Sequence, residues 1–203
     1  MLAGGRLVGA YPRAEAHRSP VQAICPVHRT GGTISSLGVT LAEAAALADE
    51  LAKQGKEREV ADLRRDWADE LELEVRSQDY RERATAYRAI GQLRFRQKTE
   101  LLRRGLEDES PACRGSALLS LELLSRDAPR EINAVRPLLH TLANADDNPA
   151  VRRLAVLSLR NGSPQRDTIV LLHGIAEEDG LERGLREQAA KVAAELEKRA
   201  KSR

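Results

Sequence analysis

The chain has 203 residues, of which 41% are hydrophobic and 32% charged, and its formal net charge is +2 at pH 7. That length is typical of a single domain with a sizeable core. Alanine (30) and leucine (29) dominate the composition and only 5 residues are aromatic, which favours an all-α fold over a β-sandwich or barrel and excludes an aromatic base-stacking platform. No apolar run approaches the roughly 18 residues of a membrane span, and two cysteines make no disulfide framework. We therefore expect a cytoplasmic protein with no membrane contact.

Residues 1–38 differ in composition from everything that follows. They hold 6 of the 14 glycines and 3 of the 8 prolines, and their apolar residues show no helical period. Such a segment buries too little apolar surface to offset the entropy that it loses on ordering. We predict a disordered leader over 1–38 and a folded domain over 39–203. The alternative is that the native chain starts at Val39, from a GTG codon, so that the leader is not part of the protein.

Two helices are expected ahead of the repeated part of the chain. Thr40 and Glu43 have the spacing of a capping box, in which each side chain accepts the other residue's backbone N–H, and a helix is predicted over 41–54. A second helix over 57–76 has apolar residues three or four positions apart, with Trp67 among them. We expect Trp67 to anchor the core instead of facing a ligand.

From about residue 79 onward, a pattern recurs in which an arginine is followed three residues later by an alanine. The arginines stand 31, 38 and 34 residues apart, at Arg83, Arg114, Arg152 and Arg186. The turn before the helix also recurs, as DESP at 108–111 and DDNP at 146–149. Ser110 and Asn148 are predicted N-caps, each followed by a proline at the first helical position, where the missing N–H costs nothing. A period of this length indicates stacked helical pairs.

The run aspartate-x-x-proline-x-apolar-arginine-x-x-alanine, placed after a leucine-rich helix, resembles a HEAT repeat over about residues 57–200. The nearest resemblance is to the bacterial HEAT-like repeats of phycobilin lyases. It implies a right-handed α–α superhelix, a short solenoid of about four helical pairs. In that family the turn aspartate and the helix arginine form a structural ladder between neighbouring repeats. By resemblance, the ladder residues are Asp79, Arg83, Asp108, Arg114, Asp146, Arg152, Asp179 and Arg186. The predicted helices are 41–54, 57–76, 80–95, 98–108, 111–125, 131–144, 149–161, 165–178 and 182–200.

One candidate binding surface is basic. The stretch from Arg76 to Arg104 holds 9 basic residues against 3 acidic ones, an asymmetry that suits an acidic partner or a nucleic-acid backbone. The alternative is that carboxylates at 66–74 and 107–109 neutralise it. The arginines proposed for binding are Arg88, Arg94, Arg96, Arg103 and Arg104.

A second candidate surface is apolar. The expected helices 111–125 and 149–161 carry apolar residues outside the core positions of the repeat, among them Leu118, Leu119, Leu154 and Leu157. Either neighbouring helices bury these residues on nearly all sides, or they form a strip for a partner helix or an extended peptide.

No motif of catalysis or cofactor binding is present. The sequence has no Gly-rich phosphate loop, no G-x-S-x-G and no H-E-x-x-H. Cys25 and His28 supply two ligands where structural zinc needs four, and His140 and His173 have no carboxylate or thiol pattern beside them. We therefore expect no catalytic residue, metal or cofactor. The hypothesis is a non-enzymatic scaffold or adaptor that binds a protein on its concave, second-helix surface; the alternatives are a nucleic-acid-binding module and an accessory subunit of a lyase-type enzyme.

Overall fold

The structure, a computed structural model, describes residues 38–126 and 128–202. Within those ranges every regular element is a helix and none is a strand, which confirms the predicted all-α fold. The predicted leader lies outside the described residues except for Gly38, and so do Cys25 and His28. No helix of the described ranges is both long enough and apolar enough to cross a bilayer.

The described part of the chain contains ten α-helices and one short 3-10 helix. Their bounds are α2 (Leu41–Lys53), α3 (Glu57–Asp66), α4 (Ala68–Glu74), α5 (Tyr80–Gln92), η1 (Arg96–Lys98), α6 (Thr99–Leu106), α7 (Pro111–Ser125), α8 (Pro129–Ala145), α9 (Pro149–Leu159), α10 (Arg166–Glu177) and α11 (Arg183–Lys201). From α4 onward the helices pack as the pairs α4–α5, α6–α7, α8–α9 and α10–α11. These are the four helical pairs that the sequence predicts.

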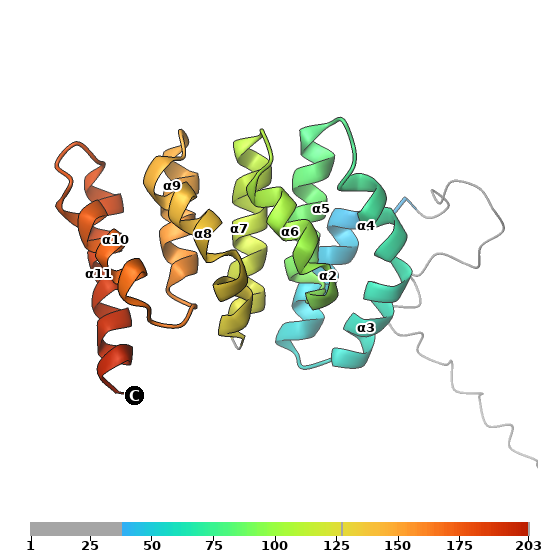
Figure 1. Cartoon of the computed structure of the whole chain (residues 1–203). Helices are drawn as coiled ribbons and strands as arrows, with labels where there is room; N and C mark the ends of the chain where they lie inside the picture. The colour runs from blue at the N-terminus through green and yellow to red at the C-terminus, as the bar shows by residue number, and fades with distance from the viewer. Residues whose placement is uncertain (1–37, 127, 203) are drawn as a thin grey trace, which may run out of the picture.

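The pairs stack side by side in two layers (Figure 1). The second helices α5, α7, α9 and α11 pack against one another in that order, with α2 beside α5, and they form what we call the second-helix layer. The first helices α6, α8 and α10 form the first-helix layer. Buried alanine, leucine and valine side chains fill the space between the layers, because one helical pair cannot enclose a core by itself. The arrangement is a short α-solenoid.

The N-terminal helices agree with the predicted signals, with one exception. The predicted capping box is present, because Thr40 Oγ1 accepts the Glu43 N–H at 3.3 Å and the Glu43 carboxylate accepts the Thr40 N–H at 2.8 Å. Gly55 ends α2 with φ +73°, a value that favours glycine. The prediction of one helix over 57–76 was wrong. The backbone of Trp67 departs from helical angles (φ −104°, ψ 5°), which separates α3 from α4, while its side chain lies in the core with 8% exposure.

Helices α5 and α7 approach each other closely at a glycine. A Cβ added at Gly91 would lie 2.6 Å from the Cα and Oγ of Ser120. Ser120 Oγ accepts the Gly91 N–H at 3.1 Å and donates to the Tyr87 carbonyl at 2.6 Å. The small residues at these positions therefore set the spacing of the second-helix layer between the first two repeats.

Candidate functional site

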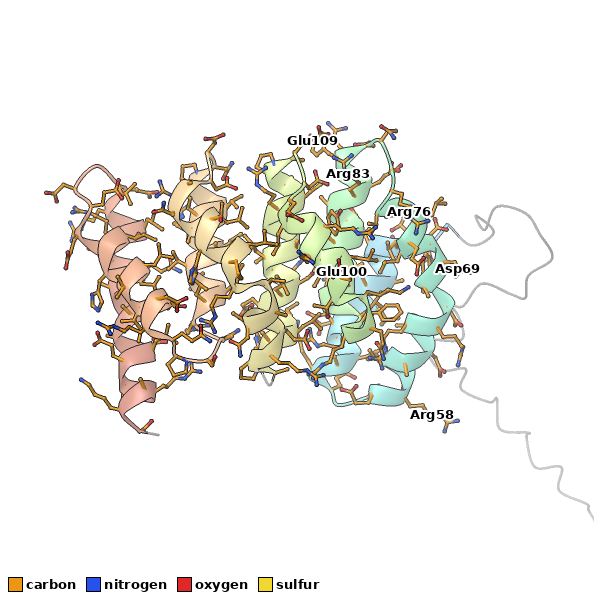
Figure 2. The ribbon with its side chains drawn as sticks, viewed as in Figure 1. Arg58, Asp69, Arg76, Arg83, Glu100 and Glu109 are labelled. Atoms are coloured by element: carbon orange, nitrogen blue, oxygen red, sulfur yellow. The ribbon has the colours of Figure 1, made fainter. Side chains whose placement is uncertain are left out.

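Two arginines of the second helices reach the turn of the following repeat. Arg83 donates from Nε and Nη2 to the two carboxylate oxygens of Asp108 at 2.9 and 3.0 Å, and Arg114 binds Asp146 in the same way at 2.7 and 2.9 Å. The Nη1 of each arginine donates to two carbonyls of the turn before its own helix. Each arginine thus ties two neighbouring turns together. Figure 2 shows Arg83 at this end of the helices beside Glu109, which it also contacts at 3.3 Å.

The carboxylates of these two pairs are buried. The side chains of Asp108 and Asp146 are 8% and 3% exposed. Burial raises the pKa of Asp108, but hydrogen bonds from Arg83 and from the Ser110 N–H outweigh it and hold this pKa below its ordinary value of 3.8. Asp108 and Arg83 therefore form an ion pair at neutral pH, and their contacts hold the turns in place.

The ladder ends after these two pairs. Arg152 occupies the equivalent helix position, but it donates to the carbonyls of Ala143 at 3.1 Å and Asn144 at 2.8 Å, and no carboxylate of the described residues pairs with it. Arg186 pairs with Asp179 of its own turn at 2.8 Å. The assignment of Arg152 to a carboxylate ladder is therefore corrected.

The turn before α11 explains this break. The residues two positions before the N-caps of α5, α7, α9 and α11 are Ser77, Asp108, Asp146 and Gly180. Only a carboxylate at that position faces the arginine of the preceding repeat, and in the last turn the position is a glycine. Asp179 lies one residue earlier, and its side chain is 99% exposed.

The arginines proposed to contact nucleic acid do not gather on one surface. Arg103 and Arg104 are exposed on α6, in the first-helix layer, and Arg96 is exposed in η1. Arg88 lies on α5, in the second-helix layer, where it lines a groove. A duplex contact surface needs its cations on one face, and these four residues are divided between the two layers and a connecting segment.

Other basic residues of the stretch are paired with carboxylates. Arg94, in the turn after α5 with φ 55°, donates to Asp49 at 3.0 Å and to the Gly91 carbonyl at 3.0 Å. Lys98 binds Glu72. Glu72 belongs to the 66–74 carboxylates that the sequence offered as neutralising partners, so Arg94 and Lys98 stabilise the fold and are not free to bind a polyanion.

The surplus leucines of α7 and α9 divide between core and surface. Leu118 is fully buried, so its assignment as a binding residue was wrong. Leu119, Leu154 and Leu157 are half-buried. Of these three, Leu154 packs against the core, on the side of α9 that faces Gly115 of α7. The alternative of complete burial therefore holds for Leu118, Leu154 belongs in part to the core, and the apolar strip stays a prediction for Leu119 and Leu157.

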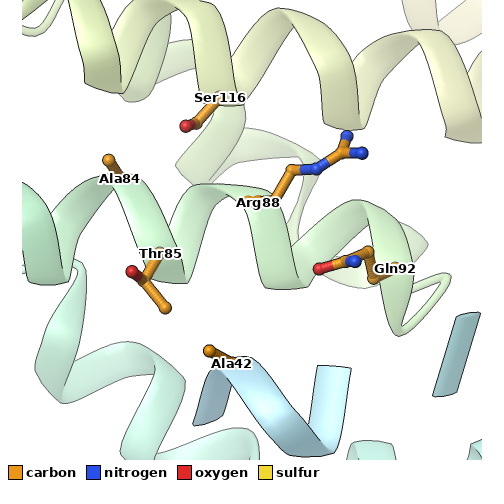
Figure 3. Close-up of a pocket in the computed structure, with 6 residues that line it drawn as sticks. All are labelled: Ala42, Ala84, Thr85, Arg88, Gln92 and Ser116. Atoms are coloured by element: carbon orange, nitrogen blue, oxygen red, sulfur yellow. The ribbon is translucent and has the colours of Figure 1, made fainter. Parts of the chain in front are cut away.

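A groove of about 390 Å³ opens between α2, α5 and α7 (Figure 3). Its lining residues are Ala42, Ala84, Thr85, Arg88, Gln92 and Ser116. Small side chains from all three helices leave it open, and Arg88 and Gln92 supply its donors. Within the described ranges, the side chains of Arg88, Gln92 and Ser116 form no hydrogen bond or ion pair. These polar groups are therefore available to a ligand.

Side chains that are partly or fully exposed recur on and just after the second helices at fixed offsets from the repeat arginine. Two residues after it stand Thr85, Ser116, Leu154 and Gln188. Five residues after it stand Arg88, Leu119, Leu157 and Lys191. Nine residues after it stand Gln92, Leu123, Asn161 and Glu195. We call these twelve positions the second-helix surface, which is polar on α5, mainly apolar on α7 and α9, and polar again on α11.

Sequence reasoning found Arg88 and three of the leucines on this surface but missed Gln92 and Ser116. Neither residue belongs to a motif, and each is an ordinary polar residue in a helix. The available signal was the offset from the repeat arginine, because equivalent positions in stacked repeats share one face.

The two histidines at equivalent repeat positions have separate partners. His140 Nε2 lies 3.0 Å from Thr168 Oγ1, and His173 Nε2 lies 2.8 Å from Glu197. Burial lowers the pKa of His140. In the part of the chain that the structure describes, no group of three or more His, Cys, Asp or Glu side chains is arranged to hold a metal ion.

Comparison with known protein families agrees with the repeat geometry. Residues 68–141, which run from α4 into α8 and include both ladder pairs except Asp146, match the family model of HEAT repeats. The chain contains HEAT repeats. No curated protein and no solved structure matches it. The predicted HEAT family is confirmed, while the likeness to the phycobilin-lyase type stays a prediction. HEAT repeats are in general protein-interaction scaffolds.

Proposed function

We propose that the protein is a non-enzymatic HEAT scaffold that binds a protein partner on its second-helix surface. The observation that supports this proposal is the order of side chains on that surface: an open polar groove at α5 lies beside half-buried leucines on α7 and α9. A partner that covers these leucines gains part of the roughly 1.5–3 kcal/mol that full burial of a leucine contributes. The hydrogen-bond donors of Arg88 and Gln92, which lie beside these leucines, supply specificity.

The rest of the molecule carries its most exposed large apolar side chains singly, within the described residues. Its large exposed apolar side chains are Leu73, Tyr80 and Val170, on α4, the start of α5 and α10. Leu73 and Tyr80 are seven residues apart but on different helices, and Val170 lies far from both in the sequence. Single exposed apolar residues are normal on a protein surface, whereas the second-helix surface combines apolar and polar positions on adjacent helices.

A photocrosslinking experiment tests this proposal. A benzophenone amino acid is placed at Ser116, on the second-helix surface, and at Arg104, which is exposed on α6. In the native host we expect position 116 to crosslink to a protein and position 104 to give none or a different set. Equal crosslinking from both positions, or crosslinking of 116 to nucleic acid alone, contradicts the proposal.

The nucleic-acid alternative makes a separate quantitative prediction. A protein that neutralises several phosphates loses affinity for duplex DNA with a log–log salt slope of about −0.9 for each of them. Because Arg88, Arg96, Arg103 and Arg104 do not converge, we expect negligible binding near 150 mM salt. Replacing Arg88, Arg96, Arg103 and Arg104 with glutamine tests this, with Arg94 retained because it stabilises the fold. A tight complex with a steep salt slope that this replacement abolishes supports the nucleic-acid function and contradicts the scaffold.

A further inference from the structure

The second-helix surface has an available cation at its α5 end. Arg88 lines the groove, and within the described residues its guanidinium has no ion pair. Two other charged pairs that border the surface are already neutralised: Glu122 binds Arg126 at 3.2 Å, and Arg153 binds Glu182 at 3.2 Å. Arg88 is therefore the charge that a partner meets on entering this side.

Apolar side chains continue from the groove toward α9. Leu119 and Leu157 hold the position of Arg88 in the next two repeats. Gly115 on α7 faces α9, since a Cβ added there would lie 3.7 Å from Leu154 Cδ1. A ligand that crosses from α5 to α9 thus meets a guanidinium, then one leucine, then another.

The spacing of the helices sets the spacing of the partner's side chains. Packed helices lie about 8–10 Å apart, and an extended chain advances about 3.3 Å per residue. An extended segment therefore passes from one helix to the next in about three residues, whereas a helix, at about 1.5 Å per residue, needs about six. We choose the extended form because it places one side chain at each helix that it crosses, and the groove of about 390 Å³ has room for one carboxylate-bearing side chain.

We propose, building on the scaffold function above, that this surface binds an extended partner segment with one acidic and two apolar residues at intervals of three. The carboxylate enters the α5 groove and accepts hydrogen bonds from Arg88 and from the Gln92 amide. The two apolar side chains cover Leu119 and Leu157. Charge complementarity at Arg88 selects the acidic residue of the partner. A segment without that residue would cover the Arg88 guanidinium and leave its charge without a counterion.

Selection from random peptides tests the proposal. A library of random 12-residue peptides displayed on phage is panned against the full chain, and enriched peptides are synthesised with a fluorescent label for anisotropy titration. We expect an aspartate or glutamate three residues from an apolar residue, with a second apolar residue three further on. R88Q should weaken binding about five- to tenfold, and R104Q, the matched control on α6, should leave it unchanged.

A double-mutant cycle completes the test. Replacing the peptide glutamate by glutamine should weaken binding to the native chain by the same factor as R88Q, and should cost little further in the R88Q variant, if the two groups form one contact. The inference is overturned if the selected peptides show no preference for an acidic residue, or if their apolar residues are spaced by about six. In that case the scaffold proposal still stands when L157E abolishes binding of the peptides. A library from which nothing binds contradicts both proposals.

Discussion

The junction between α5 and α7 and the junction between α9 and α11 are built from the same repeat and are held in different ways. At the first, Arg83 binds Asp108 across the repeat boundary and Gly91 lets the helices approach. At the second, Arg199 on α11 donates to the carbonyls of Arg160 and Gly162 at 2.5 and 2.6 Å. The first junction uses a buried carboxylate, whereas the second uses backbone oxygens just after α9 and an exposed ion pair between Arg153 and Glu182.

The difference teaches that similar repeat sequences do not ensure the same contacts. All four second helices carry the arginine at one position, yet a carboxylate accepts it across a boundary only where the turn places aspartate two residues before the N-cap. Register against the N-cap decides whether the repeat arginine reaches a carboxylate of the following turn.

The largest expected effect is at the close approach of α5 and α7. Gly91→Ala places a methyl group 2.6 Å from the Ser120 backbone, which a rotamer change cannot relieve. We expect a loss of about 3 kcal/mol in the free energy of unfolding, at the upper end of overpacking costs. Urea denaturation followed by circular dichroism measures it. Gly174→Ala is the control: this site in α10 has no neighbour within 4 Å, and alanine there should stabilise the helix by up to about 1 kcal/mol. Equal effects of the two changes would show that the helices are not closely packed at Gly91.

The second prediction compares equivalent arginines. Arg114→Ala leaves Asp146 buried without its partner and should cost about 1–3 kcal/mol. Arg152→Ala removes hydrogen bonds to two carbonyls near the end of α8 and should cost less, because it leaves no buried carboxylate without its partner. Denaturant midpoints of the two variants measure the difference. Equal losses would contradict the break of the ladder at Arg152.

The sequence predicted the architecture well because its signals are local. Alanine and leucine at helical spacing mark each helix, and Pro111 and Pro149 mark the first residues of α7 and α9. The division of the second helix at Trp67 could not be predicted in this way. The apolar period continues through 57–76 without interruption, so the spacing of the apolar residues gives no sign of the break.

The candidate site could be predicted only in part, because burial depends on neighbours that a helical period does not identify. Leu118 and Leu119 are adjacent and chemically identical, yet Leu118 is fully buried and Leu119 half-buried. The basic stretch shows the same limit. Arg94 and Arg103 lie close in the sequence, but Arg94 pairs with Asp49 while Arg103 is exposed on α6, since adjacent segments enter different layers.

Acid should remove the turn-to-turn link selectively. The pKa of Asp108 is held below 3.8 by Arg83, so the folded state binds fewer protons than the unfolded state in this range. The stabilisation is thus fully present above the unfolded pKa of about 3.9 and is lost as the pH falls through the lower folded value. The stability difference between the native chain and Arg83→Ala should shrink below pH 4. The corresponding difference for Arg152→Ala should not change, because its acceptors are carbonyls. A constant difference for Arg83→Ala from pH 6 to pH 2 would contradict the ion pair.

The smallest expected effect comes from rebuilding the missing link. Gly180 holds the turn position of Asp108 and Asp146, and a Cβ added there meets nothing within 4 Å. Gly180→Asp should therefore place a carboxylate toward Arg152 and raise the free energy of unfolding by about 0.5–1 kcal/mol. The gain should disappear when Arg152→Ala is added, and this coupling separates a new ion pair from the entropic effect of replacing a glycine. Gly180→Ala, which supplies the Cβ without the charge, measures that entropic part. If Gly180→Ala gives the same gain, or if the gain survives when Arg152→Ala is added, the new aspartate does not pair with Arg152. The turn position two residues before the N-cap would then not suffice for an ion pair between repeats.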